Sequence, residues 1–139
     1  MAPNKACPVV LRGRDGADEI LAFRHPLAGL QLVKGTIEPG ETPRAAAVRE
    51  LSEEAGIDSA QVIRDLGLWA AGYQAQIWSF HEVTVSDDLP EAWSHFTEDG
   101  GGHVFQFFWH PLNANPSSEW HSIFVNALGF IRARKSQAA

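Results

Sequence analysis

The stretch that most constrains this chain runs from Gly35 to Ile57 and reads GTIEPGETPRAAAVRELSEEAGI. Within it, Thr42 is a favourable residue for capping the start of a helix, and Pro43 suits the first helical position. Gly56 suits the left-handed position that follows the last turn. The stretch therefore predicts a helix from about Pro43 to Ala55 with a loop on either side.

Three glutamates of the predicted helix share one face. Successive helical residues turn by about 100°, so Glu54 and Glu53 lie about 40° and 60° to either side of Glu50. Ala46 lies one turn earlier on this face, where a small side chain leaves room for a ligand. A separate apolar stripe that can be buried holds Ala47, Val48, Leu51 and Ala55. Like charges at this spacing repel one another, by about 0.2–0.5 kcal/mol for an i,i+4 pair, and a hard divalent cation would reverse the sign.

Length and composition bound the class of protein. With 139 residues, of which 45% are hydrophobic and 20% charged, the sequence predicts one globular domain spanning residues 1–139. The formal charge of −6 argues against a large nucleic-acid interface. A lone cysteine, Cys7, fits a reducing compartment and is expected to be a small buried hydrophobe. We recognise neither a signal peptide nor a membrane span, and we expect a cytoplasmic protein.

The remaining segments predict a mixed sheet covered by helices. Strands are expected at residues 5–11, 19–24, 29–33, 61–71, 74–85 and 103–110. A final helix is expected at about 117–134, where Trp120, Phe124, Leu128 and Ile131 recur at helical spacing. Asp15 and Gly16 form the expected corner of a first hairpin, and Pro8 favours a sheet edge or a strand start. Residues 86–102 are expected to form a long polar loop, of a kind that often carries function.

The Gly35–Ile57 stretch resembles the Nudix box, the signature of the Nudix hydrolases, with the pattern G-x5-E-x7-R-E-U-x-E-E-x-G-U, where U is a bulky aliphatic residue. All nine specified positions are filled, by Gly35, Glu41, Arg49, Glu50, Leu51, Glu53, Glu54, Gly56 and Ile57. The resemblance implies a single Nudix hydrolase domain with an α/β/α sandwich fold, in which a mixed sheet is flanked by helices and the box forms loop–helix–loop. It also implies hydrolysis of a phosphoanhydride bond in a nucleoside diphosphate linked to another group.

The same resemblance implies a site that binds Mg²⁺ or Mn²⁺. Its ligands would be Glu50, Glu53, Glu54 and a backbone carbonyl of Lys34 or Gly35. Glu53 or Glu54 would hold the catalytic metal and help to activate water, while Arg49 and Glu41 would support and orient the metal-binding glutamates. Divalent metal suits this chemistry because it neutralises the anionic phosphate oxygens and lowers the pKa of bound water.

Three residues outside the helix are further candidates. Glu98, with its neighbour Asp99, precedes a glycine turn and is expected to be an extra carboxylate that acts as metal ligand or base; an ordinary solvated turn is the alternative. Lys34 precedes the box glycine and is expected to meet a phosphate. Tyr73 lies 16 residues after Ile57, which is similar to the dinucleoside polyphosphate hydrolases, where a tyrosine at about that distance can stack on a base.

Lys34 and Tyr73 favour a dinucleoside polyphosphate as the substrate. Other substrates are also compatible with the sequence: a nucleoside triphosphate, including an oxidised one, ADP-ribose, or a nucleotide sugar. The alternative of another class is a domain that senses a nucleotide without turning it over. The expected partner is a small nucleotide-type molecule, with no large nucleic acid and no membrane, and a homodimer stays open.

Overall fold

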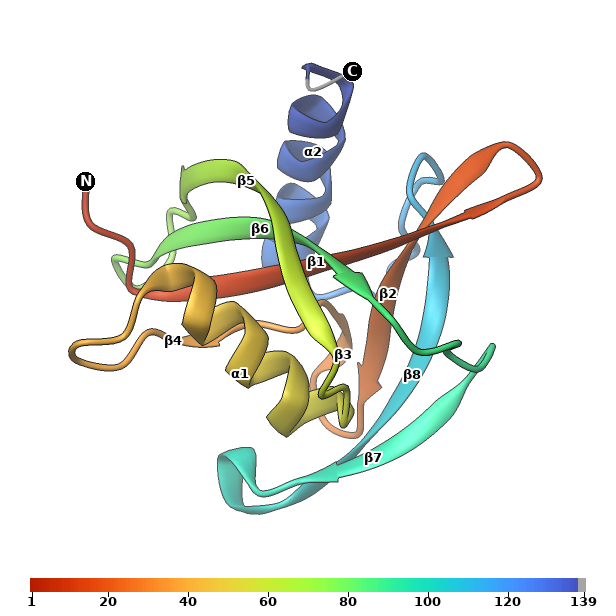
Figure 1. Cartoon of the computed structure of the whole chain (residues 1–139), viewed down its shortest axis with the longest axis horizontal. Coiled ribbons are helices and arrows are strands. Elements are labelled where there is room, and N and C mark those ends of the chain that lie inside the picture. The colour runs from red at the N-terminus through yellow and green to blue at the C-terminus, as the bar shows by residue number, and fades with distance from the viewer. Residues whose placement is uncertain (138–139) are drawn as a thin grey trace.

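The computed structural model describes residues 1–137. The strands are β1 (Lys5–Arg14), β2 (Ala17–His25), β3 (Gly29–Gln31), β4 (Gly35–Thr36), β5 (Ala60–Ala70), β6 (Ile77–Val85), β7 (Trp93–Thr97) and β8 (His103–Pro111). The helices are α1 (Pro43–Ala55), α2 (Ser122–Gln137) and the short 3₁₀ turn η1 (Asp99–Gly101). Figure 1 shows this arrangement.

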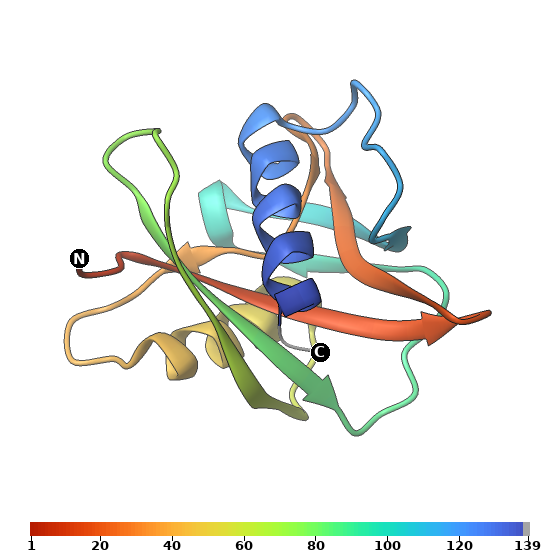
Figure 2. The same ribbon diagram turned by 90° about the horizontal axis from the view of Figure 1, so that it is seen from above.

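The strands form one mixed sheet in the order β5-β6-β1-β2-β8-β7. β1 is parallel to β6 and antiparallel to β2 and β4. Its first residues pair with β4 and its last residues pair with β2, so the sheet divides along β1. Figures 1 and 2 show α1 and α2 on opposite faces of the sheet. The expected α/β/α sandwich with a mixed sheet is confirmed.

Two apolar cores hold the helices in place. The core on the α2 face contains Trp78, Phe80, Phe124, Leu128 and Ile131. The core on the α1 face contains Phe23, Leu51, Ile57, Phe105 and Phe107. Full burial of an apolar side chain of this size contributes about 1.5–3 kcal/mol. The position of α1, and with it that of the glutamates, is therefore set by packing against the divided sheet.

The hairpin between β1 and β2 turns at the expected corner. Asp15 has φ 53° and Gly16 has φ 82°, the left-handed values that a two-residue hairpin turn requires. The expectation for Pro8 is wrong, because this residue lies inside β1. The ladder to β4 stops at Ala6 and the ladder to β2 begins at Leu11. Pro8 falls between these two ladders, where β1 pairs only with β6. Because no strand pairs with the other edge of β1 at this position, a residue without an N–H is tolerated there.

The long loop expected at residues 86–102 is wrong in its middle part. Residues 93–97 form β7, which pairs with β8 from Trp93↔Phe107 to Thr97↔His103.

The expected start of the last helix, at about residue 117, is also wrong, because Trp120 precedes α2. Leu30 donates to the Glu119 carbonyl at 3.0 Å and accepts from His121 at 3.2 Å, which holds residues 119–121 extended beside β3.

The thiol of Cys7 lies fully inside the α2-face core, as expected for a buried hydrophobe. Burial raises the pKa of this thiol, so it stays protonated and unreactive at neutral pH. Within residues 1–137, neither α-helix has the length and apolar character that a membrane crossing requires.

Candidate active site

The helix that carries the glutamates has the ends that its sequence predicts. The Thr42 hydroxyl accepts from the Ala45 N–H at 3.1 Å, and Pro43 occupies the first helical position. Gly56 has φ 74° and donates to the Ser52 carbonyl at 3.0 Å. These caps satisfy backbone groups that the helix itself leaves without partners. The glutamates therefore project from a rigid element with fixed ends.

Two of the three glutamates on the acidic face of α1 are turned toward the sheet and away from solvent. Glu50 and Glu54 are each only 5% exposed, whereas the side chain of Glu53 is 48% exposed. The expectation that Ala46 leaves room for a ligand is wrong. Ala46 is fully buried and packs with Ala47 and Ala6. Small side chains are needed here because they allow α1 to approach β1 closely.

Gly35 makes room for the carboxylate of Glu50. A Cβ at position 35 would lie 1.9 Å from the carboxyl carbon of Glu50 and 2.1 and 2.3 Å from its two oxygens. Such distances are far shorter than any non-bonded contact, so only glycine is compatible with this arrangement. The Glu50 carboxylate is thereby held directly against the backbone of β4.

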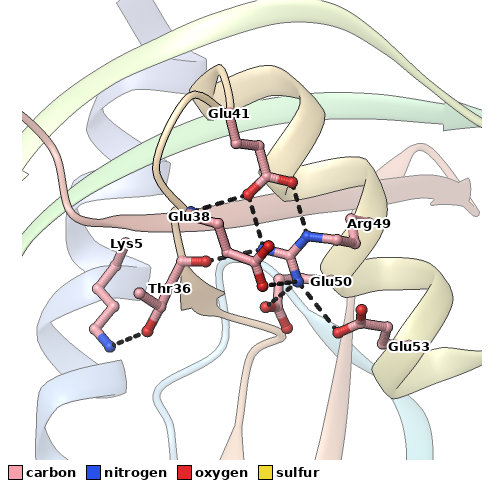
Figure 3. Close-up of polar contacts among 7 residues, drawn as sticks. All are labelled: Lys5, Thr36, Glu38, Glu41, Arg49, Glu50 and Glu53. Atoms are coloured by element: carbon pink, nitrogen blue, oxygen red, sulfur yellow. Dashed lines mark hydrogen bonds and ion pairs between the residues drawn. The ribbon is translucent and has the colours of Figure 1, made fainter.

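Arg49 is the centre of the polar network around these carboxylates (Figure 3). It donates to both oxygens of Glu41, at 2.7 and 2.8 Å, and to the Thr36 carbonyl at 2.9 Å. Its Nη1 donates to Glu50 at 2.9 Å and to Glu53 at 3.2 Å. Arg49 lowers the pKa of Glu41 to about 2, and Glu41 followed by Glu50 raises the pKa of Arg49. The network fixes the box loop to α1 and compensates the charge of the glutamates.

The donor set matches a hard divalent cation in kind. Glu50, Glu53 and Glu54 supply carboxylate oxygens from one helix, and the backbone of Gly35 lies directly against the Glu50 carboxylate. Among the side chains that the structure describes, which exclude that of Asp99, no three acidic, histidine or cysteine residues stand together in an arrangement that could hold a metal ion. The guanidinium of Arg49 instead engages Glu50 and Glu53. To bind a metal ion, Glu50 and Glu53 would have to give up part of their ion pairing with Arg49 and coordinate the cation instead.

A cavity of about 350 Å³ opens beside this network. It is lined by Lys5, Lys34, Gly35, Thr36, Glu38, Arg49, Glu50 and Glu53. The structure thus brings the predicted Lys34 to the same cavity as two box glutamates. Burial, followed by the charge of Lys5, lowers the pKa of Lys34. Lys5 itself was missed, since only its pairing opposite Thr36 in the sheet places it here.

A second cavity of about 470 Å³ is also lined by Glu53, together with Phe96, Thr97 and Glu98. Glu98 is therefore brought beside a box glutamate, which supports its candidacy. The side chain of Asp99 lies outside the described part of the chain. Glu91, which precedes β7, binds Arg12 at 2.7 Å and also pairs with Arg14.

Tyr73 is not brought to either cavity. It lies in the turn between β5 and β6 with 45% of its surface exposed, and its carbonyl accepts from Gln76 at 2.9 Å. Asn4 connects this turn to the box loop, because it accepts from Ile37 at 3.0 Å and donates to Ile77 at 2.9 Å. The turn is thus a neighbour of the box loop, which keeps Tyr73 a candidate for contact with a long substrate.

Two residues that hold the end of α1 were missed. Trp93 donates from its indole nitrogen to the Ala55 carbonyl at 3.0 Å, and a ring nitrogen of His95 lies 3.1 Å from the Glu53 carbonyl. Both carbonyls belong to the last turn of the helix, which lacks intrahelical partners. The strand-like alternation of residues 93–97 is the sequence signal that could have predicted this role. It was overlooked because we expected a loop over these residues.

A serine, a histidine and an aspartate secure the other end of α1. The Ser79 hydroxyl lies 2.7 Å from one ring nitrogen of His81, and the other lies 2.7 Å from Asp65. Asp65 also accepts two hydrogen bonds from Arg44 on α1, both at 3.0 Å. Arg44, followed by His81, lowers the pKa of Asp65. Because Ser79 is only 4% exposed, no substrate reaches its hydroxyl, and the group anchors the helix instead of supplying a nucleophile.

The fold and the carboxylate-bearing helix have counterparts among known proteins. Residues 3–128 match the NUDIX domain, and the chain belongs to this family. A segment of 39 residues is 46% identical to Nudix hydrolase 25 of Arabidopsis thaliana, and it spans 28% of this chain and 22% of that protein.

Two solved structures share the fold. The structure of a UDP-X diphosphatase superposes with a TM-score of 0.70 at 15% identity, over 100% of this chain and 66% of that one. The structure of the C. elegans Ap4A hydrolase superposes with a TM-score of 0.64 at 19% identity, over the full length of both chains. At this level of identity the likeness concerns the fold.

Proposed function

We propose that this chain hydrolyses a phosphoanhydride bond in a nucleoside diphosphate linked to another group, with Mg²⁺ or Mn²⁺ as its cofactor. The observation that carries the proposal is the placement of Glu50. Its carboxylate is almost fully buried, lies in the space that Gly35 leaves, and is held by Arg49 at 2.9 Å. A buried carboxylate fixed in this way costs stability, which is the mark of a functional group rather than of a solvated helix face.

The roles of the residues follow from their positions. Glu50, Glu53 and Glu54, with the carbonyl of Lys34 or Gly35, would hold the metal, which neutralises phosphate oxygens and makes a water molecule nucleophilic when bound. Glu53 is the box glutamate best placed to reach water, since it is half exposed and lines both cavities.

The supporting residues have distinct tasks. Arg49 and Glu41 keep the glutamates oriented through four hydrogen bonds. Glu98 would add a further carboxylate as metal ligand or base, Lys34 would bind a phosphate, and Tyr73 would stack on a base. The cytoplasmic location stays a prediction.

The substrate class that we favour is a dinucleoside polyphosphate, and the C. elegans Ap4A hydrolase is one protein of this fold that is named for such a substrate. A nucleoside triphosphate, including an oxidised one, ADP-ribose and a nucleotide sugar are the alternatives, and a UDP-X diphosphatase shares the fold as well. The contrasting function is a nucleotide sensor without turnover. The complete set of box carboxylates favours hydrolysis over sensing.

A substrate panel tests the proposal. The protein is incubated with Mg²⁺ and diadenosine tetraphosphate, ATP, 8-oxo-dGTP, ADP-ribose or UDP-glucose, and the products are separated by ion-exchange chromatography. We expect cleavage of at least one compound at a phosphoanhydride bond. Tight binding of one compound without turnover of any would overturn the proposal in favour of the sensor.

A further inference from the structure

β7 is joined to the last turn of α1 by two hydrogen bonds, and Figure 1 shows the strand passing beneath that turn. One of them is the bond from Trp93 to the Ala55 carbonyl. In the other, Nε2 of His95 lies 3.1 Å from the Glu53 carbonyl. Because a carbonyl can only accept, this nitrogen carries the hydrogen and donates it. His95 therefore holds the backbone of the box glutamate whose side chain is half exposed.

The imidazole ring of His95 also lies directly against Gly56. A Cβ at position 56 would stand 2.8 Å from Nδ1 and 3.0 Å from Cε1 of His95. The positive φ of Gly56 already favours a glycine where the helix ends, and the close approach of the ring is a second reason for one. His95 thus contacts the chain at the point where it leaves α1, and it fixes the end of the helix against β7.

β7 carries this contact onward to Glu98. Successive residues of a strand face opposite sides, so Thr97 faces α1 as His95 does, and Thr97 is only 3% exposed. The strand pairs with β8 residue by residue from Trp93 to Thr97, with no shift of register. Glu98 follows directly, and its carbonyl accepts from Gly101 at 3.2 Å, which closes the turn after the strand. Glu98 is therefore held at a fixed place relative to His95.

Glu53 and Glu98 line one cavity, although they come from elements that are distant in the sequence. Two carboxylates that share a cavity repel each other. A divalent cation that binds both oxygen donors reverses this repulsion, but only where both carboxylates can reach it. Its affinity therefore depends on the spacing between α1 and the end of β7. The contacts of His95 lie at the place where that spacing is decided.

We propose that His95 is a positioning residue of the metal site, which sets the spacing between the carboxylates of Glu53 and Glu98 so that one divalent cation can bind both. This inference rests on the proposed function, in which both carboxylates are candidate ligands. His95 is not itself a ligand in this arrangement, because its Nε2 is engaged by the Glu53 carbonyl. It acts through the backbone of Glu53, as groups behind the ligands of a metal site orient those ligands.

The test is a double-mutant cycle on the affinity for Mn²⁺, measured without substrate from the electron paramagnetic resonance signal of the free ion. The proteins are the wild type, His95→Ala, Glu98→Gln and the double variant. In the wild-type background His95→Ala should weaken Mn²⁺ binding about tenfold, the lower end of the cost of losing such a supporting group. In the Glu98→Gln background the same substitution should change the affinity by less than about twofold, because no second carboxylate remains to be spaced.

Two further variants separate positioning from the stability of the helix. His95→Gln keeps an N–H that can donate to the Glu53 carbonyl, and it should recover most of the affinity for Mn²⁺. Thr42→Ala is the matched control, because it removes the 3.1 Å hydrogen bond that caps the other end of α1 and leaves β7 untouched. It should lower the melting temperature as His95→Ala does, yet leave the affinity for Mn²⁺ at the wild-type value.

An equal loss of affinity from His95→Ala in both backgrounds would overturn the inference, because it would show that His95 only stabilises the end of the helix. So would an unchanged affinity in His95→Ala, an equal loss in Thr42→Ala, or a wild type that does not bind Mn²⁺. Because the measurement involves no turnover, it separates the two proposals. An inactive protein with the expected cycle would refute hydrolysis and keep the role of His95, while an active protein with additive losses would do the reverse.

Discussion

Gly35→Ala is the substitution with the most definite expected effect. The new Cβ would stand 1.9 Å from the carboxyl carbon of Glu50, and a tolerable separation of 3.0 Å requires that carboxylate to retreat by about 1 Å. Because Glu50 is buried, the movement breaks its hydrogen bond of 2.9 Å to Arg49. A hydrogen bond to a charged group contributes about 1.5–3 kcal/mol, so we expect the free energy of unfolding to fall by about that amount. A displacement of 1 Å at a reacting centre costs about 100-fold in rate, and we expect kcat/KM to fall by about that factor.

Urea denaturation measures the change in stability, and hydrolysis of the preferred substrate measures kcat/KM. Gly13→Ala is the matched control, since its backbone lies outside the left-handed region and no heavy atom lies within 4 Å of the added Cβ. The control should keep wild-type values in both assays. A folded Gly35→Ala protein with wild-type turnover would refute the reasoning, because it would mean that hydrolysis does not depend on where the Glu50 carboxylate lies.

Three further predictions concern the same helix. Glu53→Gln should lower turnover at least 100-fold and change the free energy of unfolding by less than about 0.5 kcal/mol, because this side chain is half exposed; full activity would exclude Glu53 from the metal site. The pKa of Glu41 is about 2, below its ordinary value of 4.5, so its stabilising charge is present above pH 4.5 and is lost as the pH falls toward 2. Urea denaturation between pH 5 and 2 should therefore show a shallower loss of stability in Glu41→Gln than in the wild type, and parallel curves would contradict this. Trp93→Phe should cost about 1 kcal/mol through loss of the 3.0 Å hydrogen bond to Ala55, measured by thermal unfolding, and an unchanged melting temperature would show that this cap is dispensable.

The parts of the site that the sequence could predict are those that local rules decide. Thr42, Pro43 and Gly56 determine the ends of α1 through backbone preferences that act within a few residues. The shared face of the glutamates follows from helical periodicity alone. The mixed sheet followed from the order of strand and helix signals. These features needed no knowledge of which segments meet in space.

The features that were missed depend on pairing between distant segments. Lys5 reaches the cavity only because β1 pairs with β4, and Ala46 is buried only because Ala6 lies beneath α1. β7 is a short edge strand whose polar residues resemble a loop, although His95 and Trp93 hold the end of the helix. Trp120 has helical spacing, yet its neighbours bond to Leu30 and keep it extended. Strand register and face assignment therefore limit how much of such a site a single sequence can predict.

We propose that the glutamates of α1 serve metal-dependent cleavage of a phosphoanhydride bond. ³¹P nuclear magnetic resonance in ¹⁸O-labelled water, with diadenosine tetraphosphate or ATP and Mg²⁺, tests it most directly. We expect new phosphate resonances to arise, one product to carry ¹⁸O on the attacked phosphorus, and chelation of the metal to stop the reaction. Unaltered spectra of every nucleotide tried, or turnover that persists after complete chelation, would contradict it.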